Sequence, residues 1–124
     1  KHKKKSMKIL EVKGRKLKIE NFFQRIAKFD FSELCNRNLG SEDYISISNN
    51  CDFIFIENLP DFNKDKSNQQ QRFITFIDII YEKKIPLMIT SNVDLNSINS
   101  SESIKEPFKR TISRLYELTS INYG

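Results

Sequence analysis

Apolar and polar residues alternate with a period of two near the start of the chain. Residues 8–12 (KILEV) and 15–19 (RKLKI) show this alternation on either side of Lys13 and Gly14. A two-residue connection with glycine, placed between two alternating segments, is typical of a β-hairpin. The pattern therefore predicts two antiparallel strands in this region.

Residues 25–31 (RIAKFDF) also alternate and predict a third short strand, which offers Ile26, Phe29 and Phe31 to a core. The character of the sequence changes after this strand. Ser32 is a candidate N-cap for a short helix, because a serine hydroxyl accepts a hydrogen bond from the free N–H groups of a first helical turn.

A second helix is expected to begin at Gly40 and Ser41. Glu42 and Asp43 then lie in its first turn, where negative charge is favoured by the helix dipole. The side chains expected to face inward are Tyr44, Ile45 and Ile47.

The second half of the chain has the pattern of a βαβ unit. Residues 53–56 (FIFI) are apolar at every position, which is typical of a central strand covered on both faces of a sheet. A helical stripe follows within residues 69–84, and residues 87–90 form another short apolar run after Pro86. This order predicts two parallel strands joined by a helix. The stripe consists of Phe73, Phe76, Ile77, Ile80 and Tyr81.

The remaining residues predict a polar loop and a last helix. The loop spans residues 91–107, with one helical turn around Leu95 to Ile98, and the helix begins at Glu106 and Pro107. Its expected buried stripe is Phe108, Ile112, Leu115 and Leu118 or Thr119. The predicted fold class is therefore α/β, with an N-terminal β-hairpin, a βαβ unit and a C-terminal helix in one domain.

Composition narrows the class of protein. The chain has 124 residues, of which 38% are hydrophobic and 30% charged, a globular balance. No apolar run approaches the roughly 20 residues of a membrane helix, and no signal peptide is recognisable, so we expect a cytoplasmic protein. Cys35 and Cys51 form no CxxC pair and His2 is the single histidine, so we expect free buried thiols and no metal site.

Positive charge is concentrated at the start of the chain. Residues 1–28 carry eleven lysines and arginines against two glutamates, whereas the rest of the chain has a net negative charge. Such a segment attracts phosphate groups, and nucleic-acid binding is one reading of it. The abundance of Ile, Asn, Lys and Phe gives the other reading, since AT-rich codons alone scatter lysines over an exposed end. We favour the second reading and expect no nucleic-acid partner.

Five stretches together have the order and spacing of one protein family. They are GRKLKI (14–19), AKFDFSELCNRNLGSEDYISIS (27–48), FIFIENLPDF (53–62), QRFITFIDIIYEKKIPLMIT (71–90) and FKRTISRLYEL (108–118). This succession resembles the C-terminal portion of the ZapE-type AAA+ ATPases of bacteria and of their mitochondrial relatives, the ATPase family gene one-like proteins. The resemblance implies a Mg²⁺-dependent ATP hydrolase that works on protein partners in cell division or protein quality control.

The chain departs from the family in its glycines. It has three glycines and no GxxxxGK followed by Ser or Thr, so it lacks the loop that cradles a triphosphate. We therefore expect an incomplete P-loop-ATPase-type domain over residues 9–124, behind a basic tail at residues 1–8. Such a chain binds no ATP or Mg²⁺ alone and is inactive without the N-terminal ATPase half or the other subunits of a homo-oligomer.

Three arginines are the candidate catalytic residues that the resemblance implies. ATPases of this type stabilise the developing charge on the γ-phosphate with arginines, often from a neighbouring subunit, and the candidates here are Arg72, Arg110 and Arg114. Arg110 and Arg114 are four residues apart, so their like charges repel unless an anion lies near them. The alternative is that they form structural ion pairs with Glu117, Asp78 or Glu106.

Other residues have both a functional and a structural interpretation. Glu57 and Asn92 follow two apolar strands and imitate the acidic and sensor residues of an ATPase core, but we interpret this as a look-alike. Asp43 and Tyr44 match a family dipeptide, yet we expect a helix cap and a core side chain. For the whole chain, the alternatives to an ATPase portion are a non-enzymatic protein-interaction module, a decayed gene product and a basic nucleic-acid binder.

Overall fold

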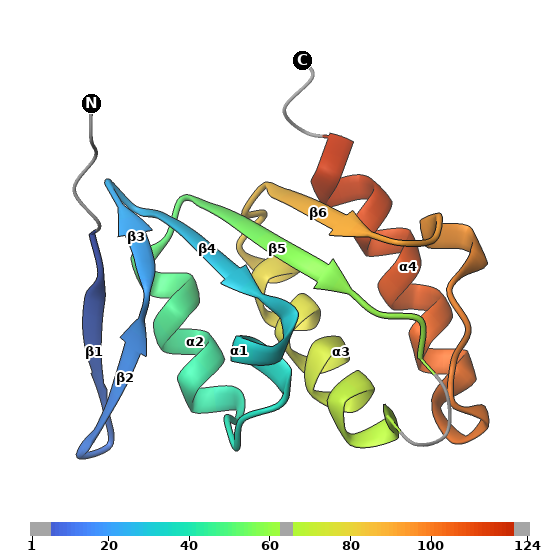
Figure 1. Cartoon of the computed structure of the whole chain (residues 1–124), viewed down its shortest axis with the longest axis horizontal. Coiled ribbons are helices and arrows are strands. Elements are labelled where there is room, and N and C mark those ends of the chain that lie inside the picture. Colours follow the sequence, from blue (N-terminus) through green and yellow to red (C-terminus); the bar gives the residue numbers. More distant parts are fainter. Residues whose placement is uncertain (1–5, 63–65, 121–124) are drawn as a thin grey trace.

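The computed structural model describes residues 6–62 and 66–120 (Figure 1). Its strands form two sheets. The first is a hairpin of β1 (Lys8–Val12) and β2 (Arg15–Ile19), and the second has the order β3 (Asn21–Phe23), β4 (Ile26–Asp30), β5 (Phe53–Leu59), β6 (Leu87–Ser91). The α/β class predicted from the sequence is therefore confirmed.

The predicted N-terminal hairpin is present, with β1 and β2 in antiparallel register. Lys13 and Gly14 both have positive φ angles, of 50° and 80°, as the two central residues of a tight hairpin turn require. The Phe22 N–H donates to the Ser6 carbonyl over 3.0 Å and so joins the start of the hairpin to the main sheet.

A second hairpin, between β3 and β4, was not predicted from the sequence. Its turn residues Gln24 and Arg25 have φ angles of 52° and 66°. Because neither is Gly, Asn or Asp, the usual signature of such a turn is missing. Strand β4 is the predicted third strand, but Ile26 is 42% exposed and Ala27 takes the inward position beside Phe29. Side chains on one face of a strand are two residues apart, so Ile26 and Phe29 cannot share a face.

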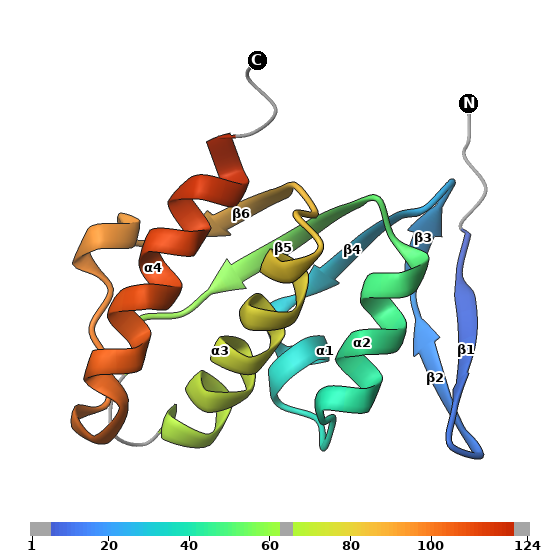
Figure 2. The same ribbon diagram turned by 180° about the vertical axis from the view of Figure 1, so that it is seen from behind.

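Strands β4, β5 and β6 are parallel, with β5 in the centre, which confirms the predicted βαβ unit. Helices cover one face of this sheet, as the two opposite views in Figures 1 and 2 show. The prediction that residues 53–56 are covered on both faces is wrong, because Phe53 and Phe55 are only partly buried on the face opposite the helices.

The helices begin and end close to the predicted positions. They are α1 (Phe31–Cys35), α2 (Ser41–Asn50), α3 (Ser67–Glu82) and α4 (Lys105–Ser120), with 3₁₀ turns at Leu95–Ser97 and Glu102–Ile104. Two details of the prediction are wrong. Asp30, not Ser32, is the N-cap of α1 and forms a capping box with Glu33. Ile45 is 44% exposed, because it lies on the outer side of α2.

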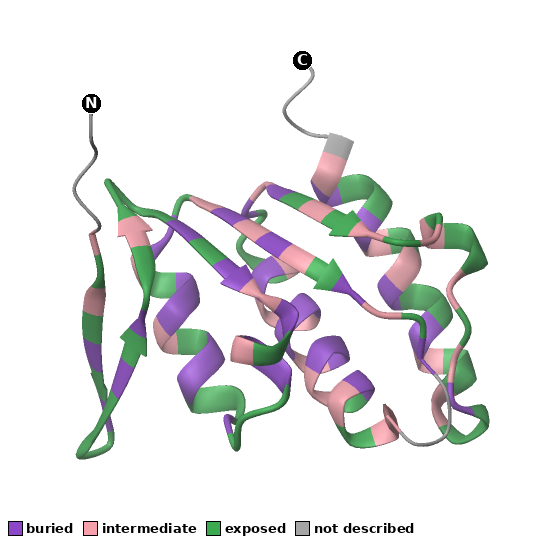
Figure 3. Ribbon diagram, viewed as in Figure 1, coloured by how far each residue is buried: buried purple, intermediate pink, exposed green. Residues whose placement is uncertain are grey.

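Buried residues lie where the helices meet the sheet (Figure 3), and a cluster of phenylalanine rings is part of this core. The ring of Phe62, in the segment after β5, lies 5.5 Å from the rings of both Phe31 and Phe108 and 6.2 Å from that of Phe73. These four residues come from α1, α3, α4 and the segment after β5. The cluster therefore holds the C-terminal helix against the rest of the domain.

Candidate functional site

The three candidate arginines lie on the two long helices, α3 and α4, which pack against each other. Arg72 is on α3, and Arg110 and Arg114 are one turn apart on α4. The three guanidinium groups differ in whether they make ion pairs or hydrogen bonds within the domain. This difference decides which of them is available to a ligand.

Arg114 is held within the domain. Its Nη1 lies 2.5 Å from Oδ1 of Asp78 on α3, and its guanidinium carbon lies 4.5 Å from the centre of the Tyr81 ring. The Arg114 side chain is 24% exposed, so this ion pair is partly shielded from water. The structural alternative considered for Arg114, an ion pair with Asp78, is the arrangement observed.

The Arg72 guanidinium also makes a hydrogen bond within the domain. Its Nη1 donates a 2.8 Å hydrogen bond to the carbonyl oxygen of Cys35, the last residue of α1. The last carbonyls of a helix have no partner within the helix, so Arg72 satisfies one of these groups and ties α3 to α1.

Arg110 differs from the other two. It is exposed on α4, and within residues 6–62 and 66–120 it makes no ion pair or side-chain hydrogen bond. The nearby Glu106 is paired with Lys109 at 3.3 Å. Of the three candidates, Arg110 is therefore the one whose guanidinium has no partner among the described residues.

A polar cluster lies at the carboxyl ends of the parallel strands, the usual location of ligands in α/β sheets. The Asn58 side-chain amide donates to Oδ1 of Asp30 over 2.6 Å, and the Asn58 backbone N–H donates to the Thr90 hydroxyl over 3.0 Å. Asn58 has a φ of 64° and lies at an irregularity in the pairing of β5 with β6. Sequence reasoning missed this residue, although asparagine at the end of a strand is a signal for such a backbone conformation.

Glu57 and Asn92, interpreted from the sequence as a look-alike of an ATPase core, have separate surroundings. Glu57 lies 3.4 Å from the Lys28 ammonium group, on the neighbouring strand. Asn92 is exposed after β6, and no hydrogen bond joins it to Glu57 in the described part of the chain. These contacts agree with the interpretation of the two residues as a look-alike of an ATPase core.

Asp30 joins the strand ends at this cluster and also caps helix α1. Besides its bond from Asn58, its carboxylate accepts hydrogen bonds from the Ser32 backbone and hydroxyl at the start of α1. The hydrogen bond from Asn58 and then that from the Ser32 side chain lower the pKa of Asp30 below its ordinary value. A lowered pKa in the folded state means that ionised Asp30 stabilises the fold.

This coupling predicts a pH-dependent stability difference for Asp30→Asn, which keeps the shape of the cap and removes the charge. Above about pH 4, the ordinary pKa of an aspartate, the wild-type chain is expected to be the more stable. As the pH falls through the lowered pKa, Asp30 becomes protonated and the difference shrinks. Urea unfolding between pH 2 and 7 measures it, with Asp94→Asn as a control for an exposed aspartate. A difference independent of pH would contradict this role.

The remaining predicted residues have structural surroundings. Asp43 is buried, accepts from the Gly40 N–H over 2.8 Å and lies 2.6 Å from Arg15, and the Tyr44 hydroxyl donates to the Leu34 carbonyl. Cys35 and Cys51 are free buried thiols as predicted, and burial raises the pKa of Cys51 to about 11.

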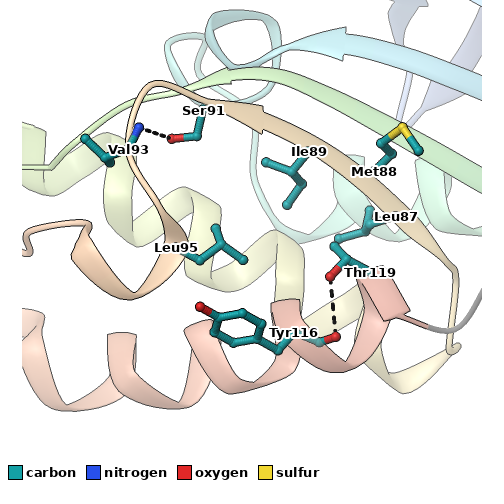
Figure 4. A pocket seen from close by; sticks show the side chains of 8 residues that line it. All are labelled: Leu87, Met88, Ile89, Ser91, Val93, Leu95, Tyr116 and Thr119. Carbon is teal, nitrogen blue, oxygen red and sulfur yellow. Dashed lines mark hydrogen bonds between the residues drawn. The ribbon is translucent and has the colours of Figure 1, made fainter.

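An apolar groove of about 380 Å³ lies between α4 and β6, at the free edge of the main sheet (Figure 4). Met88 and Tyr116 on its walls are 41% and 47% exposed, unusually high for such side chains. The sequence predicted both elements but not the groove. Its lining consists of Leu87, Met88, Ile89, Ser91, Val93, Leu95, Tyr116 and Thr119.

Two classes of site are not seen in the described part of the chain. No group of three or more His, Cys, Asp or Glu side chains there has the arrangement of a metal site. None of the helices in those residues has the length and apolarity to cross a membrane. Residues 1–5 of the predicted basic tail lie outside the described residues.

Comparisons with known proteins point to one family. A family model described as AFG1-like ATPase matches residues 1–124. The chain is 31% identical over 90 residues to lactation elevated protein 1 homolog B of Danio rerio, which covers 73% of this chain and 18% of that protein. It is 27% identical over 114 residues to cell division protein ZapE of Escherichia coli K12, which covers 92% of this chain and 30% of that protein. The chain thus spans less than a third of either relative, and no solved structure matches it significantly.

Proposed function

The chain belongs to the AFG1-like ATPase family, and from this premise we propose that it supplies Arg110 to an ATP-hydrolysing site whose nucleotide-binding loop lies in another part of the ATPase. The single observation that supports this is the state of the three arginines. Arg72 and Arg114 are occupied by Cys35 and Asp78, whereas Arg110 is exposed and unpaired among the described residues.

A guanidinium at the γ-phosphate contributes to hydrolysis by electrostatics. As the bond to the γ-phosphate breaks, negative charge develops on the phosphate oxygens, and the planar fork of arginine donates two hydrogen bonds to such oxygens. No carboxylate of the described residues forms an ion pair with Arg110. The ion pair of Arg114 with Asp78 also removes the repulsion that an unpaired Arg114 would exert on Arg110.

The described residues do not form a complete nucleotide site. Gly14 lies in the hairpin turn and Gly40 caps α2, so neither belongs to a phosphate loop. Within residues 6–62 and 66–120, no three His, Cys, Asp or Glu side chains converge as they would in a metal site built from protein ligands alone. The chain's contribution is therefore one positive charge and the surface that positions it.

The test compares ATP hydrolysis by this chain alone, by the remaining part of Escherichia coli ZapE alone, and by the two combined in trans or as one fused polypeptide. We expect hydrolysis only when both parts are present, because neither contains all the groups at the γ-phosphate. Hydrolysis by the ZapE part alone at the full rate would contradict the proposal. Steady-state phosphate release at saturating ATP and Mg²⁺ measures each rate.

The groove beside β6 favours a second candidate function, a protein-interaction module. Among the described residues β6 is an edge strand, and together with the exposed Tyr116 it has the features of a surface that binds an apolar peptide segment. In this case the partner is a protein of cell division or quality control. A combined preparation that forms a stable complex but hydrolyses no ATP would favour this function over the first.

A further inference from the structure

Among the described residues, helices cover only one face of the main sheet, and the other face is apolar at the end where its strands β4, β5 and β6 begin. The helices lie on one side of strands β4, β5 and β6 (Figures 1 and 2). The burial of residues alternates along these strands, so the less buried residues face the opposite side. We name this opposite side the bare face. Its apolar residues are Phe23, Ile26, Phe53, Phe55 and Met88.

The strand register makes these five side chains one continuous band. Phe23 lies opposite Ile26, Ile26 lies opposite Phe53, and Phe55 lies opposite Met88. The rings of Phe53 and Phe55 are 5.2 Å apart on β5, which joins the two halves of the band. The band therefore crosses all four strands of the sheet.

Three of these five side chains are exposed, and Phe53 and Phe55 are partly buried. Phe23 is 61% exposed, Ile26 42% and Met88 41%. Parallel sheets occur almost only with both faces covered, and a contiguous apolar patch on a soluble surface marks an interaction site. Towards the carboxyl ends of the strands the face becomes polar, with the ion pair of Lys28 and Glu57 at 3.4 Å.

We propose that the bare face is covered by the apolar side of a helical layer from the nucleotide-binding part of an AFG1-like ATPase. This rests on the proposed function, in which that part completes the site. Two observations favour this occupant. The related proteins extend well beyond the matched region, which is 30% of ZapE, so they contain enough chain for a second layer. The apolar band also fits the apolar stripe of an amphipathic helix.

The test measures how fast a reporter thiol on the bare face reacts with a maleimide. Met88→Cys places the reporter on this face, and Ile45→Cys on α2 is the matched control, with 41% and 44% of the native side chains exposed. The native Cys35 and Cys51 are buried and stay as they are. Each variant is measured in this chain alone and in the fusion with the remaining part of Escherichia coli ZapE.

We expect the fusion to slow labelling of the bare-face reporter by about tenfold or more, as for a group that reacts only when a layer opens, and to leave the control thiol on α2 nearly unchanged. If the fusion does not fold, the same rates are measured after mixing the separately purified parts. Equal labelling rates of the bare-face reporter with and without the ZapE part would overturn the proposal. Protection of that reporter that rises with the concentration of this chain alone would also overturn it, since the occupant would be a second copy.

The outcomes separate this inference from the role of Arg110. The labelling is repeated in the fusion carrying Arg110→Ala, where the surface for docking is intact. If the bare-face reporter is protected but Arg110→Ala does not change the rate of hydrolysis, the covered face is supported and the role of Arg110 is refuted. A fusion that hydrolyses ATP through Arg110 but leaves the bare-face reporter fully reactive would overturn the covered face and leave the proposed function standing.

Discussion

Replacing Arg110 by alanine is expected to lower the rate of ATP hydrolysis by the combined ATPase by about 10³- to 10⁵-fold, the range found for arginines at a transferring γ-phosphate. The loss should fall on kcat more than on KM, because the charge that Arg110 stabilises develops in the transition state. Arg110→Lys should restore only part of the rate, since an ammonium group cannot donate as a fork. Steady-state kinetics of the fusion at saturating Mg²⁺-ATP measures these values.

A matched control separates this effect from a general loss of positive charge. Arg37 is exposed between α1 and α2 and has no ion pair among the described residues, so Arg37→Ala should leave the rate within about twofold, as for surface substitutions generally. The free energy of unfolding of the Arg110→Ala chain should also match that of the wild type. A normal hydrolysis rate in Arg110→Ala would contradict the proposal that this arginine acts at the γ-phosphate.

Phe62→Ala is expected to destabilise the isolated domain by about 3–5 kcal/mol, the usual cost of truncating a buried phenylalanine. Phe62 is fully buried, and its ring meets those of Phe31, Phe73 and Phe108. The cavity would therefore open where four separate segments meet. A small domain has about 5–15 kcal/mol of stability in total, so this loss is a large fraction of the free energy of unfolding. Urea unfolding followed by circular dichroism measures the loss.

Two further substitutions test whether the loss comes from the aromatic cluster. Phe62→Leu keeps most of the apolar volume and should cost about half as much or less. Phe23→Ala removes the same ring from a site that is 61% exposed and should change the free energy of unfolding by about 1 kcal/mol at most. Equal destabilisation by Phe62→Ala and Phe23→Ala would contradict the placement of Phe62 in the core.

Several elements were predictable because their signals are local. The alternation around Lys13 and Gly14 predicted the first hairpin, and the stripe through Phe73 and Ile80 predicted α3. Each depends on residues close together in the chain. The second hairpin was not predicted because such a local signal is missing there: Gln24 and Arg25 are not residue types that favour positive φ angles.

The candidate site was predictable only as a set of residues. The sequence indicated three arginines, but the contacts that distinguish them join residues far apart. Arg114 meets Asp78 across 36 positions and Arg72 meets Cys35 across 37. Which arginine remained unpaired therefore depended on how α3 packs against α1 and α4, and no periodicity in the sequence encodes those pairings.

The sequence by itself determined the order and type of most elements, the free thiols and, through the spacing of its motifs, the family. Only the tertiary structure decided that Asn58 bridges Asp30 and Thr90, that Arg110 stays unpaired among the described residues, and that one face of the sheet is bare. The physical reason is that period and propensity act within a few residues, so they specify elements. Which surfaces are covered depends on how elements distant in the chain pack, since burial is a property of the packed whole.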